Sequence, residues 1–435
     1  MKQKQVFNNA KWIIVCKIAQ SLIQLIVGML CARYLGPSNY GLINYAASIV
    51  AFVLPIMRLG FDSTLVRELI ENPENEGKIM GTSLIMNIIS AVICIFGVFT
   101  FVSISNFGDN ETIIVCVLYS ISLLFAALEM IQYWFQYKLV SKYSSIVMLI
   151  AYVVVSAYRI YLLASSKSVY WFALTNSLDF GIIGISLIVI YLKKSAQRLS
   201  FSYKMGKIMI SRSKHYILAS LMVVVIQNTD HIMLTTMIGK TENGFYSAAI
   251  TCATVAQFVY IAIIDSYRPL ILANKKTDEV AYERNLAGLY CITTYMALIQ
   301  GVVFTIFASL FVGILYGADY TATVPVLQIL VWYFAFSVMG TVRNVWILAE
   351  EKQKYLWIIN LSGAVFNIVL NAITIPIWGA CGAAFASLLT QFFTNFILGF
   401  IFKPIRNNNR ILLKGINPRF LVREMRNIIS VLQKK

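Results

Sequence analysis

The chain has 435 residues, of which 59% are hydrophobic and only 13% are charged, and its formal net charge is +17. A soluble protein carries about twice that share of charged residues, and it could not hide so much apolar surface from water. The composition therefore excludes a soluble protein and predicts a membrane protein with many spans. We expect no nucleic-acid partner despite the positive charge, because the basic residues fall on one side of the predicted membrane domain.

Segments of roughly 20 mostly apolar residues, each long enough to cross a bilayer as a helix, follow one another along the chain. They predict an all-α integral membrane fold with about twelve transmembrane helices. The first segment has no small-residue cleavage pattern, so we expect a retained helix rather than a signal peptide. The predicted spans are 12–33, 42–58, 80–102, 112–133, 144–164, 171–192, 216–237, 244–264, 286–312, 326–348, 356–375 and 380–402.

Lysines and arginines are concentrated in every second connection between these spans. If the N-terminus is cytoplasmic, almost all of the 36 basic residues fall in the cytoplasmic tails and loops. By the positive-inside rule, we expect both termini in the cytoplasm. The exceptions, outside or in an outer half, are Arg33, Arg159, Lys167 and Lys240.

A basic segment, 193–215, divides the predicted spans into two groups of six. We therefore expect an N-terminal six-helix bundle over 1–192, this cytoplasmic linker, a C-terminal six-helix bundle over 216–402 and a basic cytoplasmic tail over 403–435. Within the tail, the amphipathic stretch from Phe420 to Leu432 is expected to lie on the anionic inner surface of the membrane.

The two predicted halves share a glycine pattern. Gly36 and Gly41 follow the first span, Gly239 and Gly244 follow the seventh, and each pair is followed by two alanines. The pattern predicts a parallel internal repeat about an axis along the membrane normal, with the transport site in a cavity between the halves.

Cysteine and histidine give no sign of a disulfide framework or a metal site. The seven cysteines lie inside apolar runs without a CxxC motif, which is typical of small buried residues. His215 and His231 are the only histidines, so a His-rich metal centre is excluded. We expect no metal and no cofactor.

Four segments resemble those of polysaccharide biosynthesis membrane proteins. Residues 31–41, CARYLGPSNYG, resemble the R-x-LG-P-x-x-YG hairpin of that family, and residues 58–68, RLGFDSTLVRE, resemble the loop after its second helix. Residues 228–249 resemble the start of its second half, and residues 376–384, PIWGACGAA, the turn before its last helix. These are the O-antigen, capsule and exopolysaccharide repeat-unit flippases, whose superfamily includes the multidrug-and-toxin extruders and the lipid II flippase.

The resemblance implies a fold like that of the multidrug-and-toxin extruders, in the inner membrane of a bacterium. It implies a transporter without catalytic residues, which flips an undecaprenyl-diphosphate-linked oligosaccharide for the assembly of lipopolysaccharide O-antigen, capsule or exopolysaccharide. The implied partners are that lipid-linked sugar, membrane lipids and a polysaccharide polymerase with its chain-length regulator. It also implies alternating access around a central, often cationic, cavity.

A diphosphate crossing the membrane requires lysine or arginine side chains. Lys17, Gln20 and Gln24 share one face of the first span, which favours a cavity lining, although Lys17 could instead snorkel and the glutamines join helices. Arg33 ends that span, where it could bind phosphate or cap the helix. All four are candidate substrate-binding residues.

Three further arginines are candidates for the same role. An arginine within a span is costly, so Arg159 is expected either to bind substrate or to pair with Asp179 in the next span. Arg268 and Arg343 lie at inner span ends, where they could receive the diphosphate or be ordinary positive-inside residues.

Carboxylates inside spans are candidates for coupling to protons or Na⁺, because burial favours their neutral form. Asp230, Glu129 and Asp179 meet this condition. The structural alternative for each is a buried ion-paired or hydrogen-bonded group.

Other functions stay open. An ion-coupled multidrug extruder of the same superfamily would favour acidic and aromatic linings, whereas the charges within the spans here are mixed. A membrane enzyme, such as a polysaccharide polymerase or ligase, would need a long external loop with catalytic residues, and no predicted external loop is long. A secondary transporter of another fold would share the topology but not the four motifs.

Overall fold

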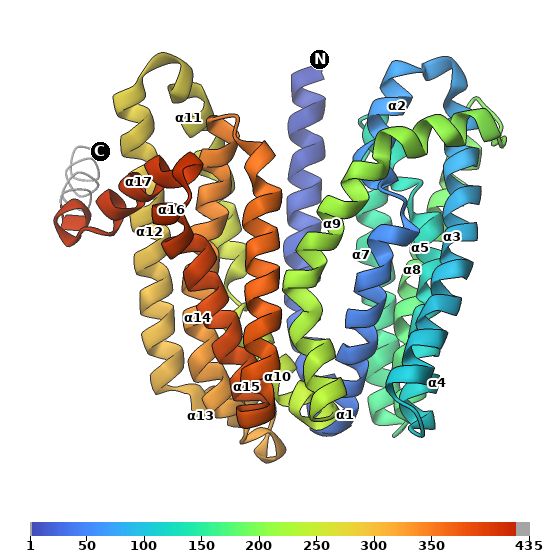
Figure 1. The fold of residues 1–435 in the computed structure, drawn as a ribbon. Coiled ribbons are helices and arrows are strands. Elements are labelled where there is room, and N and C mark those ends of the chain that lie inside the picture. The colour runs from blue at the N-terminus through green and yellow to red at the C-terminus, as the bar shows by residue number, and fades with distance from the viewer. Residues whose placement is uncertain (1, 423–435) are drawn as a thin grey trace. The chain divides into compact units, whose positions relative to one another are not determined.

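The computed structural model describes residues 2–422, with the side chains at 2–19, 21, 22 and 219 outside that description. Over this range the chain is almost entirely helical, and no strand occurs there (Figure 1). The long helices are α1 (Lys2–Met57), α3 (Glu76–Ser105), α7 (Lys142–Ala164), α8 (Val169–Lys194), α9 (Tyr203–Met237), α11 (Gln257–Thr277), α12 (Glu279–Ile306), α14 (Thr323–Ala349) and α15 (Leu356–Phe392). The shorter ones are α2 (Leu65–Glu71), α4 (Asn110–Ser120), α5 (Ser122–Glu129), α6 (Gln132–Tyr137), α10 (Lys240–Ala253), α13 (Ala308–Leu315), α16 (Leu398–Ile401) and α17 (Arg406–Ile416), besides short 3₁₀ turns and a π-helix at Phe393–Ile397.

Nine helical segments among the described residues are long and apolar enough to cross a membrane. The pair α10 and α11, bent by 44° at a short break, supplies a tenth if it forms one span. Two of the nine, Ile23–Met57 and Gln353–Ile401, each cover two predicted spans, so the described residues account for twelve spans if the bent pair forms one of them.

Glycines separate the two arms of each of these long helices. Gly36 in α1 has φ 68° and Gly379 in α15 has φ 54°. Glycine adopts this left-handed backbone at little cost, and Pro37 follows the first of the two turns. Figure 1 shows the chain turning back on itself within α1.

The chain divides into two compact units, Met1–Gly244 and Phe245–Lys435. In the first, α5 packs against α8, and α1 packs against α7 and α9. One of its core clusters includes Phe61, Trp134 and Tyr191. In the second, α14 packs against α12 and α15 around Tyr290 and Trp346. The assignment of 1–192 and 216–402 to two six-helix bundles stays a prediction.

Residues 193–215, predicted as a linker, are helical from Tyr203 onwards. The Ser202 side chain accepts a hydrogen bond from the backbone N–H of Met205 and caps α9, as serine does at a helix N-terminus. From there α9 continues into the predicted seventh span without interruption. Lys204, Lys207, Arg212 and Lys214 of this segment therefore lie on α9.

The predicted basic tail begins with the amphipathic helix α17. One face is buried, whereas Arg406, Arg410 and Lys414 are exposed. The tail's predicted surface helix, from Phe420 to Leu432, lies almost wholly outside the described residues. The buried face consists of Asn408, Asn409, Ile411, Leu412 and Gly415, and α17 packs on α12.

Candidate functional site

The candidates on the first arm of α1 differ in exposure. Gln20 is half-buried, whereas Gln24 and Arg33 are exposed. Lys17 belongs to the same helix, but its side chain lies outside the described part of the chain. The shared polar face therefore stays a prediction from the sequence.

A polar cluster joins α7 and α8 inside the first unit, made of Tyr152, Arg159, Thr175 and Asp179. Arg159 is half-buried, and its Nε donates a hydrogen bond to Thr175 Oγ1 at 3.1 Å. Asp179 lies one turn after Thr175, and its buried Oδ1 has no hydrogen-bond partner among the described residues. Arg159 thus binds Thr175, and the ion pair with Asp179, one of the two alternatives for Arg159, is not formed among the described residues.

The α7–α8 cluster has unused hydrogen-bonding capacity. The Tyr152 hydroxyl is buried in the same cluster, where it interacts with both Arg159 and Asp179. Tyr152 and Arg159 are seven residues apart, and Thr175 and Asp179 four, so each pair shares one helix face. A cation and an unpartnered carboxylate oxygen close together suit the binding of a polar or ionic group.

Glu129 occupies a different environment. Its Oε2 lies 2.9 Å from Nη2 of Arg58, with side-chain exposures of 11% and 18%, respectively. This is a largely buried ion pair, which holds the end of α1 against α5. The structural alternative foreseen for Glu129 is thus the arrangement observed.

Asp230 is buried about two turns before the C-terminal end of α9. The neighbouring His231 lies with Nδ1 2.7 Å from Asn243 Oδ1, and Asn243 Nδ2 donates to the Gly41 carbonyl at 2.8 Å. This part of α9 is therefore held within a buried polar network that reaches α1.

The two candidate arginines of the second unit differ in exposure and in bonding partner. Arg268 is exposed and pairs with Asp265 at 2.9 Å. Arg343 is buried, and its Nη1 donates to the Thr394 carbonyl at 2.7 Å. Thr394 belongs to the π-helix at Phe393–Ile397, whose widened turn disturbs the regular backbone hydrogen bonds. Arg343 thus binds this irregular turn from a buried position.

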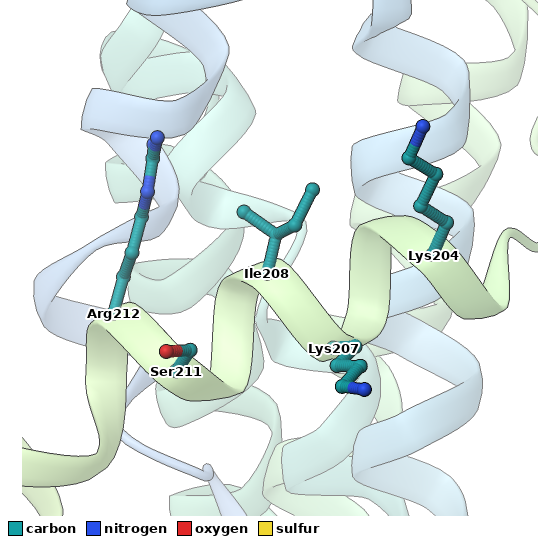
Figure 2. Close-up of a pocket in the computed structure, with 5 residues that line it drawn as sticks. All are labelled: Lys204, Lys207, Ile208, Ser211 and Arg212. Carbon is teal, nitrogen blue, oxygen red and sulfur yellow. The ribbon is translucent and has the colours of Figure 1, made fainter.

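A basic pocket on the first part of α9 was not foreseen. It has a volume of about 370 Å³ and is lined by Lys204, Lys207, Ile208, Ser211 and Arg212 (Figure 2). Sequence reasoning counted these basic residues only as linker charge. The signal that could have revealed the helix is Ser202 followed by small or apolar residues at 206, 209 and 213, a spacing typical of one helix face.

Comparison with known proteins places the fold. The profile of a family described as polysaccharide biosynthesis protein matches residues 6–275. The lipid II flippase MurJ, in an inward closed conformation, superposes with a TM-score of 0.69 at 16% identity over 94% of this chain and 92% of that one. An inward-facing multidrug resistance MATE family transporter of the MOP superfamily gives 0.67 at 14% identity over 91% and 96%.

A MATE transporter from Vibrio cholerae, VcmN, is also similar, with a TM-score of 0.55 at 11% identity over 94% of this chain and 98% of that chain. No curated protein sequence matches the chain. At these identities the structural likeness shows a shared fold. The predicted all-α membrane fold, similar to that of multidrug-and-toxin extruders, is confirmed.

Proposed function

This chain belongs to the polysaccharide biosynthesis protein family, and from that premise we propose that it is a flippase rather than an enzyme. Its cargo is an undecaprenyl-diphosphate-linked oligosaccharide repeat unit, moved across the inner membrane of a bacterium for the assembly of O-antigen, capsule or exopolysaccharide. A polymerase and a chain-length regulator would then act on the flipped product.

The half-buried Arg159 is the observation that carries the proposal. A guanidinium within a membrane span is costly unless it is used, and its fork of donors matches the oxygens of a diphosphate. Arg159 donates to the neutral Thr175 hydroxyl, so its charge is not cancelled by a direct hydrogen bond to a carboxylate. We assign it the role of binding the diphosphate during transfer.

Asp179 supports ion coupling in the same cluster. Its unpartnered buried oxygen could bind a proton or Na⁺, which would bias the neighbouring Arg159 toward or away from the anionic cargo. Glu129 is a weaker coupling candidate because Arg58 already neutralises it. Asp230 is retained as a second coupling candidate, since it is buried in a span.

The remaining predicted substrate-binding residues differ in how accessible their side chains are to the cargo. The exposed Gln24 and Arg33 are accessible to a ligand, and Lys17 and Gln20 are proposed to extend the same lining. Arg268 is exposed but paired with Asp265. Arg343 is the least suited, because it is buried and bound to a backbone carbonyl.

One observation favours a second function, the multidrug extruder. A carboxylate with one unpartnered buried oxygen, as in Asp179, would attract an organic cation, and transporters described as multidrug resistance proteins share the fold. The basic side chains of the first unit favour the anionic cargo instead.

The test is a gene deletion in the native bacterium, followed by analysis of lipid-linked sugars in spheroplasts with an external glycosidase. We expect undecaprenyl-diphosphate oligosaccharide to accumulate on the inner face, out of reach of the glycosidase, and to become accessible when the gene is restored. Unchanged access with altered chain length would indicate a role in polymerisation. Unchanged sugars with greater drug sensitivity would indicate an extruder.

A further inference from the structure

The first part of α9, residues 203–214, is fastened to α3 by its buried face. Gly206 lies so close to α3 that a Cβ there would come within 2.6 Å of the Met86 sulfur. Met209 is fully buried, and the Ser213 hydroxyl donates to the Leu59 carbonyl at 2.7 Å. The other faces of this helical segment are exposed.

Two adjoining cavities meet along this segment and share Lys207. One is the basic pocket of about 370 Å³. The other is an apolar groove of about 540 Å³ between α3 and α9. The groove is lined by Leu59, Met86, Ile89, Ser90, Ile93, Phe201, Tyr203, Gly206, Lys207 and Ile210.

The walls of the groove are apolar side chains that remain accessible. On α3, Ile89 is 54% and Ile93 is 66% exposed, four residues apart on one helix face. On the opposite side, Phe201 and Tyr203 are also exposed. Such an accessible, elongated apolar surface fits a hydrocarbon chain.

Two lysines, Lys204 and Lys207, line the basic pocket, and Lys207 also lines the groove. Among the described residues, neither Lys204 nor Lys207 forms an ion pair. Arg212 differs, because its Nη1 bonds to Glu68 at 2.8 Å and to Glu71 at 3.1 Å. Figure 2 shows Lys204 and Arg212 on the same side of α9 and Lys207 projecting from another side.

We propose that this groove is a binding site for an anionic phospholipid of the bilayer. Its phosphate headgroup binds Lys204 and Lys207, with the Ser211 hydroxyl within the same pocket, and one acyl chain lies along Ile89 and Ile93 of α3. A zwitterionic lipid fits less well, since its own ammonium would approach two lysines. The segment lies on the side predicted to be cytoplasmic, where anionic lipids are concentrated. The site does not depend on the proposed flippase activity.

The experiment uses the full purified chain in detergent and native mass spectrometry with phosphatidylglycerol and phosphatidylcholine of identical acyl chains. We expect wild-type protein to prefer phosphatidylglycerol, and each of Lys204→Ala and Lys207→Ala to reduce that preference about fivefold. The double Lys→Arg variant should keep it. Lys276→Ala, at an exposed lysine of the second unit, is the matched control and should leave it unchanged.

Three outcomes overturn the proposal. Equal binding of the two lipids by wild-type protein would show that the headgroup charge does not determine binding. An unchanged preference in the doubly substituted Lys204→Ala/Lys207→Ala protein would show that phosphatidylglycerol binds at another site. Displacement of phosphatidylglycerol by a much lower concentration of undecaprenyl phosphate would assign the groove to the cargo lipid instead. Ile93→Asn tests the contact with the acyl chain. It should weaken the binding of both lipids equally, because it changes the apolar contact and not the charge.

Discussion

Gly41 in α1 and Gly244 in α10 lie in backbone contact, so neither position has room for a side chain. A Cβ on Gly41 would lie 2.6 Å from the Gly244 nitrogen and would also overlap the Lys240 carbonyl oxygen. A Cβ on Gly244 would lie 2.9 Å from Pro37 Cα. The two glycines allow the hairpin after the first span to pack directly on the hairpin after the seventh.

We therefore expect Gly41→Ala and Gly244→Ala each to destabilise the protein by about 1–3 kcal/mol, the usual range for an overpacked site. The double variant should be less than additive, because both changes disturb one contact. Thermal unfolding of the purified protein measures both effects. Gly97→Ala is the control, since a Cβ there meets nothing within 4 Å, and it should be neutral or stabilising.

The sequence predicted these glycines as equivalent positions of a repeat but not as partners. Hydropathy located the spans well, because a bilayer demands long apolar segments wherever they occur. Which hairpin contacts which depends on side-chain shape across two distant parts of the chain, and one sequence does not contain that information. The sequence pattern predicts that Gly41 and Gly244 are equivalent positions, and the structure adds that they are in contact.

Glu129 allows a test that separates stability from coupling. Glu129→Gln leaves Arg58 largely buried without its counter-charge, so we expect a loss of about 3–5 kcal/mol in the free energy of unfolding. The double change Arg58→Met/Glu129→Leu should recover much of that loss, because no unpaired charge remains. Denaturant unfolding followed by tryptophan fluorescence measures it. A fully stable Glu129→Gln protein with an altered pH profile of transport would assign Glu129 to coupling instead.

Arg343 is expected to act in structure and not in substrate binding. Arg343→Met removes the donor to the Thr394 carbonyl and leaves that carbonyl buried without its partner, which costs about 1–3 kcal/mol. Protein that still folds should transport with unchanged apparent affinity for the lipid-linked cargo. A specific rise in KM at normal thermal stability would contradict this and return Arg343 to the substrate site.

The site residues were harder to predict than the spans. A basic residue near a span end suggests an interfacial position, as it did for Arg343, because the π-helix that it stabilises arises from packing between distant helices. The segment from Lys204 to Arg212 has the charge density typical of a linker, and its buried face, formed by Gly206 and Met209, is not evident from composition. In contrast, the cost of charge inside a span singled out Arg159 and Asp179 from sequence alone, although not the Thr175 hydroxyl bound to Arg159.

Arg159 and Asp179 should respond differently to substitution if the first binds diphosphate and the second couples the ion. Arg159→Ala should reduce delivery of the lipid-linked oligosaccharide at least tenfold, since one charge-assisted contact is worth about 1.5–3 kcal/mol, whereas Arg159→Lys should retain part of it. Asp179→Asn should bind cargo normally but lose the dependence of transport on an imposed pH or Na⁺ gradient.

Proteoliposomes loaded with fluorescent lipid-linked oligosaccharide, with an external quencher reporting its leaflet, measure both properties. Thr175→Val is the matched control: it removes the neutral partner of Arg159 at nearly constant volume, so transport should fall only slightly. Equal losses in Arg159→Ala and Thr175→Val would mean that their hydrogen bond supports the helix pair, because a direct role of the guanidinium on the diphosphate requires the arginine variant to be far more impaired.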